Sequence, residues 1–193
     1  MKKFTVKDLI NAGLFSLLTL GAFYLSGMIG IVPVLMPFLP FTCALVSGPI
    51  FMLYSTRIDK FGMILIMGIL FSLVFSASGH GGYIIPFGIL ISLLAEWVMS
   101  RGNYHSVKWA RLAYTVFSLF TFSLLLPVFI ARDQYLQNLI DTGYGADYAA
   151  KFSQVLPSWS FPFIILLGCV GGYLGCTIGI KMLNKHFRKA HMI

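Results

Sequence analysis

The chain has 193 residues, of which 58% are hydrophobic and only 10% are charged, and its formal net charge is +8. Soluble domains carry about 25% charged residues, so the composition excludes an ordinary soluble domain. The basic residues lie in short clusters beside long apolar stretches, as the positive-inside rule predicts for membrane proteins, and this argues against nucleic-acid binding.

Six apolar stretches approach or reach the length that a helix needs to cross a bilayer. They predict an all-α membrane protein, a six-transmembrane-helix bundle that forms a single domain over residues 1–193. A long polar outer loop, 131–160, separates the last two stretches. In chain order the expected spans are 9–28, 34–54, 61–76, 84–99, 110–130 and 161–183.

The segment 27–41 joins the first two spans and contains Pro33, Pro37 and Pro40. Proline removes a backbone donor and clashes with the preceding turn, so we expect an irregular or kinked segment here. Irregular backbone at membrane depth is tolerated only where it is buried in protein or lines a cavity. A re-entrant second span is the alternative.

The turn between the third and fourth spans contains Gly79, His80, Gly81 and Tyr83. Glycines permit positive φ and a close approach of a ligand, and histidine can donate, accept or change charge near neutral pH. A ligand contact and a tight interfacial turn are equally compatible with this pattern. With Pro37, these four residues are the candidate substrate-binding set.

The outer loop carries two apolar stripes at helical spacing, which predict two short amphipathic helices. These helices would either pack on the membrane surface or fold over a cavity as a lid. The stripes are Tyr135, Leu136, Leu139 and Ile140, then Tyr148, Phe152, Val155 and Leu156.

Glu96 is the one acidic residue well inside an apolar span. Ionisable groups there are costly and are usually paired or functional. Because Arg101 follows closely, we expect an interfacial acid that pairs with the basic loop or contacts a partner protein, in preference to a proton relay.

Small residues at helical spacing let helix backbones touch. Gly171, Gly175 and Gly179 form such a row in the sixth span, and Ala12 with Ser16 forms a milder one in the first. Packing inside the bundle is the default interpretation for both rows, and an interface with another membrane subunit is the alternative.

The basic residues define an orientation with both termini in the cytoplasm, because only Arg132 and Lys151 of the 14 Lys and Arg then lie outside. The sequence has no HExxH, no GxSxG and no carboxylate cluster, so we expect no enzyme activity, no metal and no cofactor. The cytoplasmic set is Lys2, Lys3, Lys7, Arg57, Lys60, Arg101, Lys108, Arg111, Lys181, Lys185, Arg188 and Lys189.

Three sequence segments resemble the Trep_Strep (MptD-like) family of bacterial integral membrane proteins: GMIGIVPVLMPFLP, SGPIFMLYSTRIDKFGMILIMG and SGHGGYIIPFGILISLLAEW. The resemblance implies a substrate-binding (S) component of an energy-coupling factor (ECF) importer in the bacterial cytoplasmic membrane. Such a component captures a vitamin or other small-molecule micronutrient at its outer face.

The same resemblance implies partners. A membrane scaffold (T) subunit and two ATPase subunits would supply the energy, and Ala12 and Ser16 would dock on the scaffold. A membrane accessory or assembly protein without a small-molecule site is the alternative, and an independent secondary carrier ranks third.

Overall fold

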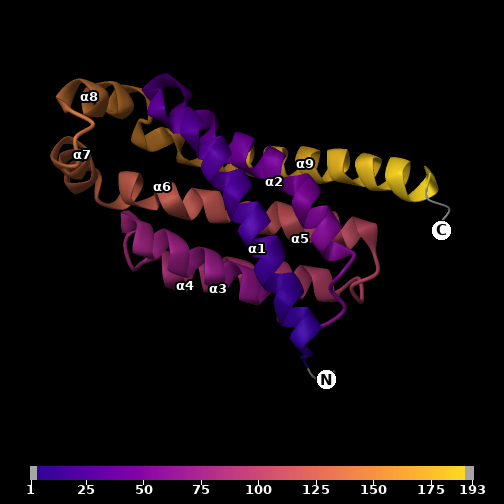
Figure 1. Cartoon of the computed structure of the whole chain (residues 1–193). Coiled ribbons are helices and arrows are strands. Elements are labelled where there is room, and N and C mark those ends of the chain that lie inside the picture. Colours follow the sequence, from indigo (N-terminus) through magenta and orange to yellow (C-terminus); the bar gives the residue numbers. More distant parts are fainter. Residues whose placement is uncertain (1–3, 190–193) are drawn as a thin grey trace.

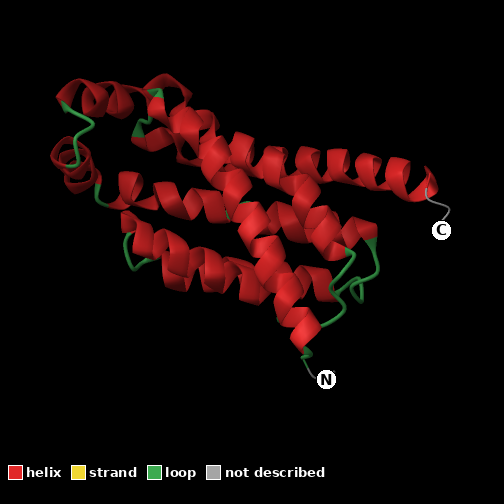
Figure 2. Cartoon of the chain, in the orientation of Figure 1, coloured by secondary structure: helices red, strands yellow, loops and turns green. Residues whose placement is uncertain are grey.

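The structure, a computed structural model, describes residues 4–189 and the side chains of residues 4–185. All regular structure within this part of the chain is helical (Figure 2). Lys2 and Lys3, and the side chains of Arg188 and Lys189, belong to the predicted cytoplasmic set and lie outside the described residues.

Nine α-helices and four shorter helical turns follow one another in the described chain (Figure 1). In order they are α1 (Val6–Gly27), η1 (Met28–Ile31), η2 (Pro33–Phe38), α2 (Leu39–Ser55), α3 (Met63–Phe75), η3 (Ser76–His80), α4 (Ile84–Ser100), α5 (Val107–Phe117), α6 (Phe120–Ile130), α7 (Arg132–Asp141), α8 (Ala146–Val155), η4 (Ser158–Ser160) and α9 (Phe161–Lys189).

Five helical segments are long and apolar enough to cross a membrane, which confirms the all-α membrane class. Helix α4 is apolar but has only 17 residues. At 1.5 Å per residue it spans roughly 25 Å, somewhat less than a hydrocarbon core of about 30 Å, so a sixth span stays a prediction. The five segments are Val6–Ile31, Pro33–Ser55, Met63–His80, Val107–Ile130 and Ser158–Lys185.

The outside of the bundle is covered by apolar side chains. On α1, Ile10, Leu14, Leu17 and Leu25 are all more than half exposed. So large an exposed apolar surface suits contact with lipid and would be a liability in water.

The segment 27–41 is irregular, as its prolines predict. Helix α1 passes into η1 and η2, which are both 3₁₀-helical, before α2 begins at Leu39. Pro33 occupies the first turn of η2, where its missing N–H costs nothing.

The expected single helix over 110–130 is interrupted between α5 and α6. At the break the Ser118 hydroxyl lies 2.7 Å from the Thr115 carbonyl and 3.1 Å from the Gly168 carbonyl of α9. Serine hydroxyls that bond preceding carbonyls bend helices. The interruption therefore arises from a contact with α9 as well as from local sequence.

Helices α2 and α9 pack with their backbones in contact. A Cβ at Gly171 would lie 2.4 Å from the Phe41 carbonyl oxygen, and a Cβ at Gly175 would lie 2.6 Å from that of Leu45. The glycine row of α9 therefore serves packing within the bundle, the default interpretation of its spacing.

A cluster of aromatic rings fills the centre. The Phe71 ring centroid lies 5.4 Å from that of Phe23, 5.7 Å from that of Phe117 and 5.5 Å from that of Phe120. These rings are at most 2% exposed, and most of the contacts are edge-on, the geometry that aromatic quadrupoles favour.

The connections gather at two opposite ends (Figure 1). One end holds the start of α1 and the α2–α3 and α4–α5 connections, and the other holds η1, the α3–α4 turn, α7 and α8. At the first end Lys60 forms an ion pair with Asp8, which also caps α1 through Thr5. Which end faces the cytoplasm stays a prediction.

Candidate functional site

The α3–α4 turn is built from glycines in conformations that other residues rarely adopt. Gly79 has φ +90° and Gly81 has φ +91°, and a Cβ at Gly81 would also lie 2.8 Å from the Tyr83 ring. The turn starts later than the predicted end of the third span at residue 76, because helical backbone continues beyond Ser76 and is first broken at Gly79.

Two adjoining cavities lie at this end of the bundle. The large cavity has a volume of about 740 Å³ and is bounded by the α3–α4 turn, α4, α6 and α7. The small cavity, about 300 Å³, is bounded by the end of α1, η1, the start of α2, α7 and α8. Five residues line both: His80, Leu124, Tyr135, Leu139 and Tyr144.

The structure thus brings four of the five predicted substrate-binding residues to one place. Gly79, His80, Gly81 and Tyr83 all line the large cavity. Pro37 is buried in η2 and lines neither cavity, whereas its neighbour Met36 lines the small one. Pro37 therefore shapes the segment, and its position does not favour a ligand contact.

No Lys, Arg, Asp or Glu is found among the residues that line these two cavities. Their polar groups are neutral side chains, including Gln134 and Asn138 on α7. Burial raises the pKa of the Tyr83 phenol to about 12 and also raises that of Tyr135, so both hydroxyls stay protonated at neutral pH. The cavities therefore offer aromatic faces and uncharged hydrogen-bonding groups.

The predicted amphipathic helices of the outer loop are present as α7 and α8, which we call the cover helices. The Tyr148 hydroxyl of α8 donates to the Gly30 carbonyl at 2.7 Å and ties the cover to η1. Tyr135 of α7 packs on Phe152 of α8, with ring centroids 5.6 Å apart. The apolar stripes thus hold the cover helices together and also line the cavities.

Arg132, the first residue of α7, connects the two cover helices through hydrogen bonds to the end of α8. Its guanidinium donates to the Leu156 carbonyl at 2.6 Å, to the Ser153 carbonyl at 2.6 Å and to the Ser153 hydroxyl at 3.0 Å. These acceptors lie at the carboxyl end of α8, where a cation is also favoured by the helix dipole.

Some residues that line the cavities were not predicted from the sequence. Gln134 and Asn138 lie one turn apart on α7, and Leu124 and Pro127 come from α6. The available signal was the i, i+4 pair of amide side chains beside the Tyr135 and Leu139 stripe.

Glu96 has a role inside the chain that differs from the predicted ion pair. Its side chain is fully buried and accepts hydrogen bonds from the Ile64 amide at 2.7 Å, the Leu65 amide at 3.1 Å and the Tyr104 hydroxyl at 2.9 Å. Arg101 instead stacks on Trp97, 4.3 Å from the ring centroid. The carboxylate thus satisfies amides that the start of α3 leaves open.

Ala12 and Ser16 also face inward, at 0% and 1% exposure. Their small size serves contacts of α1 within the bundle. A partner interface through Ala12, Ser16 or Glu96 stays a prediction, and none of these side chains presents appreciable surface to a partner.

The sequence model of one family, "Hypothetical bacterial integral membrane protein (Trep_Strep)", matches residues 6–189. The chain has no significant match among curated proteins or among solved structures. The family match extends over nearly the whole described chain, including both cavities and the cover helices. The chain therefore belongs to the Trep_Strep family of integral membrane proteins.

Proposed function

We propose that this chain is the substrate-binding component of an ECF-type importer and captures an uncharged, ring-bearing small molecule in the two adjoining cavities. The main support for this proposal is the pair of cavities beneath the cover helices, which are lined by aromatic and neutral polar side chains. Their volumes fall in the range of small-molecule sites, roughly 300–1,000 Å³.

The neutral lining favours one class of ligand. A charged group in these cavities would lose its hydration and meet no counter-charge, and burial of an unpaired charge is strongly unfavourable. A planar ring could stack on Tyr135 or Tyr144, and its polar substituents could bond His80, Gln134 or Asn138. A vitamin-like heterocycle fits this chemistry better than a metal ion or a phosphorylated compound.

The proposal includes six spans, with α4 as the sixth and both termini in the cytoplasm. This arrangement places the cavities and the cover helices at the outer face, where an importer meets its substrate. On this proposal, two partner ATPases and a membrane scaffold subunit supply the energy for transport.

Native mass spectrometry of the protein, gently extracted from its own membranes, tests the proposal. We expect a retained small molecule together with a scaffold and two ATPases. A bare protein, or one bound only to unrelated membrane proteins, would move the assignment to an accessory or assembly role.

A pair of matched histidine variants tests the location of the site. His80→Ala removes a side chain shared by both cavities, and we expect roughly tenfold lower ligand affinity from the loss of one hydrogen bond. His105→Ala removes a histidine at the opposite end and serves as the control. Equal affinity in the two variants would exclude His80 from the site.

A further inference from the structure

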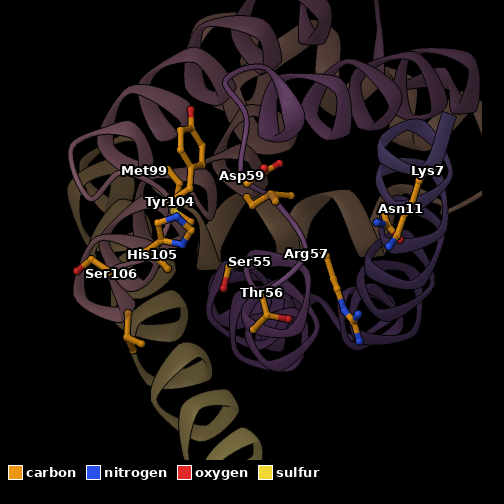
Figure 3. Close-up of a pocket in the computed structure, with 13 residues that line it drawn as sticks. Lys7, Asn11, Ser55, Thr56, Arg57, Asp59, Met99, Tyr104, His105 and Ser106 are labelled. Atoms are coloured by element: carbon orange, nitrogen blue, oxygen red, sulfur yellow. The ribbon is translucent and has the colours of Figure 1, made fainter. Parts of the chain in front are cut away.

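A third cavity, of about 430 Å³, lies at the opposite end of the bundle, and we call it the basic cavity. Figure 3 shows Lys7 and Asn11 of α1 on one side, Tyr104, His105 and Ser106 of the α4–α5 connection on the other, and residues 55–59 between them. The start of α1 and two connections that are remote in sequence thus enclose one space.

The lining of the basic cavity has more cations than carboxylates. Lys7 and Arg57 both line it, whereas the neighbouring Lys60 forms an ion pair with Asp8. Asp59 is the one carboxylate in the lining, and in Figure 3 it points away from the Arg57 guanidinium.

The start of α5 adds partial positive charge. Ser106 is the N-cap residue, but its side chain makes no capping hydrogen bond, and Ser106 and Val107 both line the cavity. The first amides of a helix lack intrahelical acceptors, and the helix dipole favours an anion beside them. Donors at Asn11, Ser55 and Thr56 complete a lining that suits phosphate oxygens.

We propose that the basic cavity binds the phosphate group of an anionic phospholipid. Exposed apolar side chains next to lining residues favour a lipid over a soluble phosphate compound. Val107 lines the cavity and is 51% exposed, and Val6 and Ile10, which precede Lys7 and Asn11 in α1, are 74% and 62% exposed. Acyl chains would lie along these residues while the phosphate contacts Lys7, Arg57 and the start of α5. Basic pockets between membrane helices bind anionic headgroups in the same manner.

This inference requires only that the chain spans a membrane, so its test is independent of the proposed import function. The purified protein, in a neutral detergent, is titrated with phosphatidylglycerol, phosphatidylcholine, inorganic phosphate and glycerol phosphate, and its thermal unfolding midpoint is followed. A ligand that binds the folded state alone raises the midpoint in a saturable manner. We expect this rise with phosphatidylglycerol and not with phosphatidylcholine.

Charge-removing variants locate the effect. The double variant Lys7→Gln/Arg57→Gln is expected to weaken the apparent affinity for phosphatidylglycerol roughly 30-fold, since each cation near the surface contributes about 1 kcal/mol. Lys181→Gln/Lys185→Gln removes the same charge from exposed positions on α9 outside the cavity and should retain the wild-type affinity. If the double variant has too low an unfolding midpoint to titrate, the single variant Arg57→Lys is measured instead. It keeps the charge and should retain most of the affinity for phosphatidylglycerol.

Each outcome decides the proposal. An equal loss of phosphatidylglycerol affinity in the two double variants would mean that net charge alone explains the effect, and it would overturn the proposed site. No rise with any of the four ligands would also overturn it. A saturable rise with inorganic phosphate or glycerol phosphate that depends on Lys7 and Arg57 would retain the phosphate site and reject the lipid as its source.

Discussion

The contact between Arg132 and the end of α8 gives the sharpest prediction about the cover helices. We consider Arg132→Ala, which removes three hydrogen bonds of 2.6, 2.6 and 3.0 Å to Leu156 and Ser153. Hydrogen bonds to charged groups contribute about 1.5–3 kcal/mol each when shielded. Because Arg132 is only partly buried, we expect a combined loss of about 2 kcal/mol.

This loss should be local. The cover helices pack on the bundle through a small core separate from the central one, in which Phe152 and Leu156 meet Leu125, Val128 and Ile164. The variant should therefore favour opening of α7 and α8 while the α2–α9 core stays closed. A loss of about 2 kcal/mol corresponds to roughly 30-fold faster amide exchange where local opening limits exchange. Hydrogen–deuterium exchange should therefore speed up across residues 146–155 and stay unchanged in the α2–α9 contact.

Two further variants test the reasoning. Lys151→Ala removes the other cation of the cover helices, which is exposed, and should leave exchange unchanged. Arg132→Lys keeps the charge but loses the planar fork of donors, and should give an intermediate rate. Unchanged exchange of α8 in Arg132→Ala would refute the assignment of Arg132 as the link between the cover helices.

Two predictions concern the bundle. Gly175→Ala should destabilise the fold by about 1–3 kcal/mol, because its Cβ would meet the α2 backbone. The control Gly21→Ala lies on the exposed face of α1 with no atom within 4 Å of its Cβ, and it should be neutral or stabilising. Equal unfolding midpoints for the two variants would contradict the packing of α9 on α2. Glu96→Ala should lower the free energy of unfolding by about 3 kcal/mol, because it leaves the Ile64 and Leu65 amides unpaired. Glu96→Gln keeps an acceptor and should lower it clearly less. A larger loss of stability in the glutamine variant would contradict this role.

The sequence predicted the helical stretches well because hydrophobic length and basic boundaries are local signals. Residues 84–99, expected as one helix, differ from α4 by a single residue. The break after Phe117 was missed because no glycine or proline marks it. One of the two acceptors of the Ser118 hydroxyl at the break is the Gly168 carbonyl, fifty residues away, which no local pattern reveals.

Glu96 shows the same limit more clearly. Its sequence neighbour Arg101 suggested an ion pair, yet the acceptor role is set by α3, more than thirty residues earlier. A clue was available, because Gly62 precedes α3 and supplies no side-chain cap. A helix start without Ser, Thr, Asp or Asn needs acceptors from elsewhere, and a buried carboxylate can supply them.

Arg132 also explains an exception in the charge pattern. It is one of two cations that the predicted orientation places outside, where Lys and Arg are rare. The structure gives it hydrogen-bond acceptors at the end of α8, so its position follows from a specific contact and not from membrane topology. Lys151, the other exception, lies exposed on α8.

The aromatic core bears on how a ligand could cross the membrane. A continuous series of ring contacts runs from Phe75, at the small cavity, through Phe71, Phe117 and Phe51 to Tyr54. Tyr54 directly precedes Ser55, which lines the basic cavity. Every ring in this series is at most 4% exposed. Truncation of one such ring costs about 3–5 kcal/mol, so losing the contacts of all five would match or exceed a typical stability of about 5–15 kcal/mol. Passage of a ligand along the bundle axis therefore requires the packed helices to rearrange, and we expect no open channel through this chain.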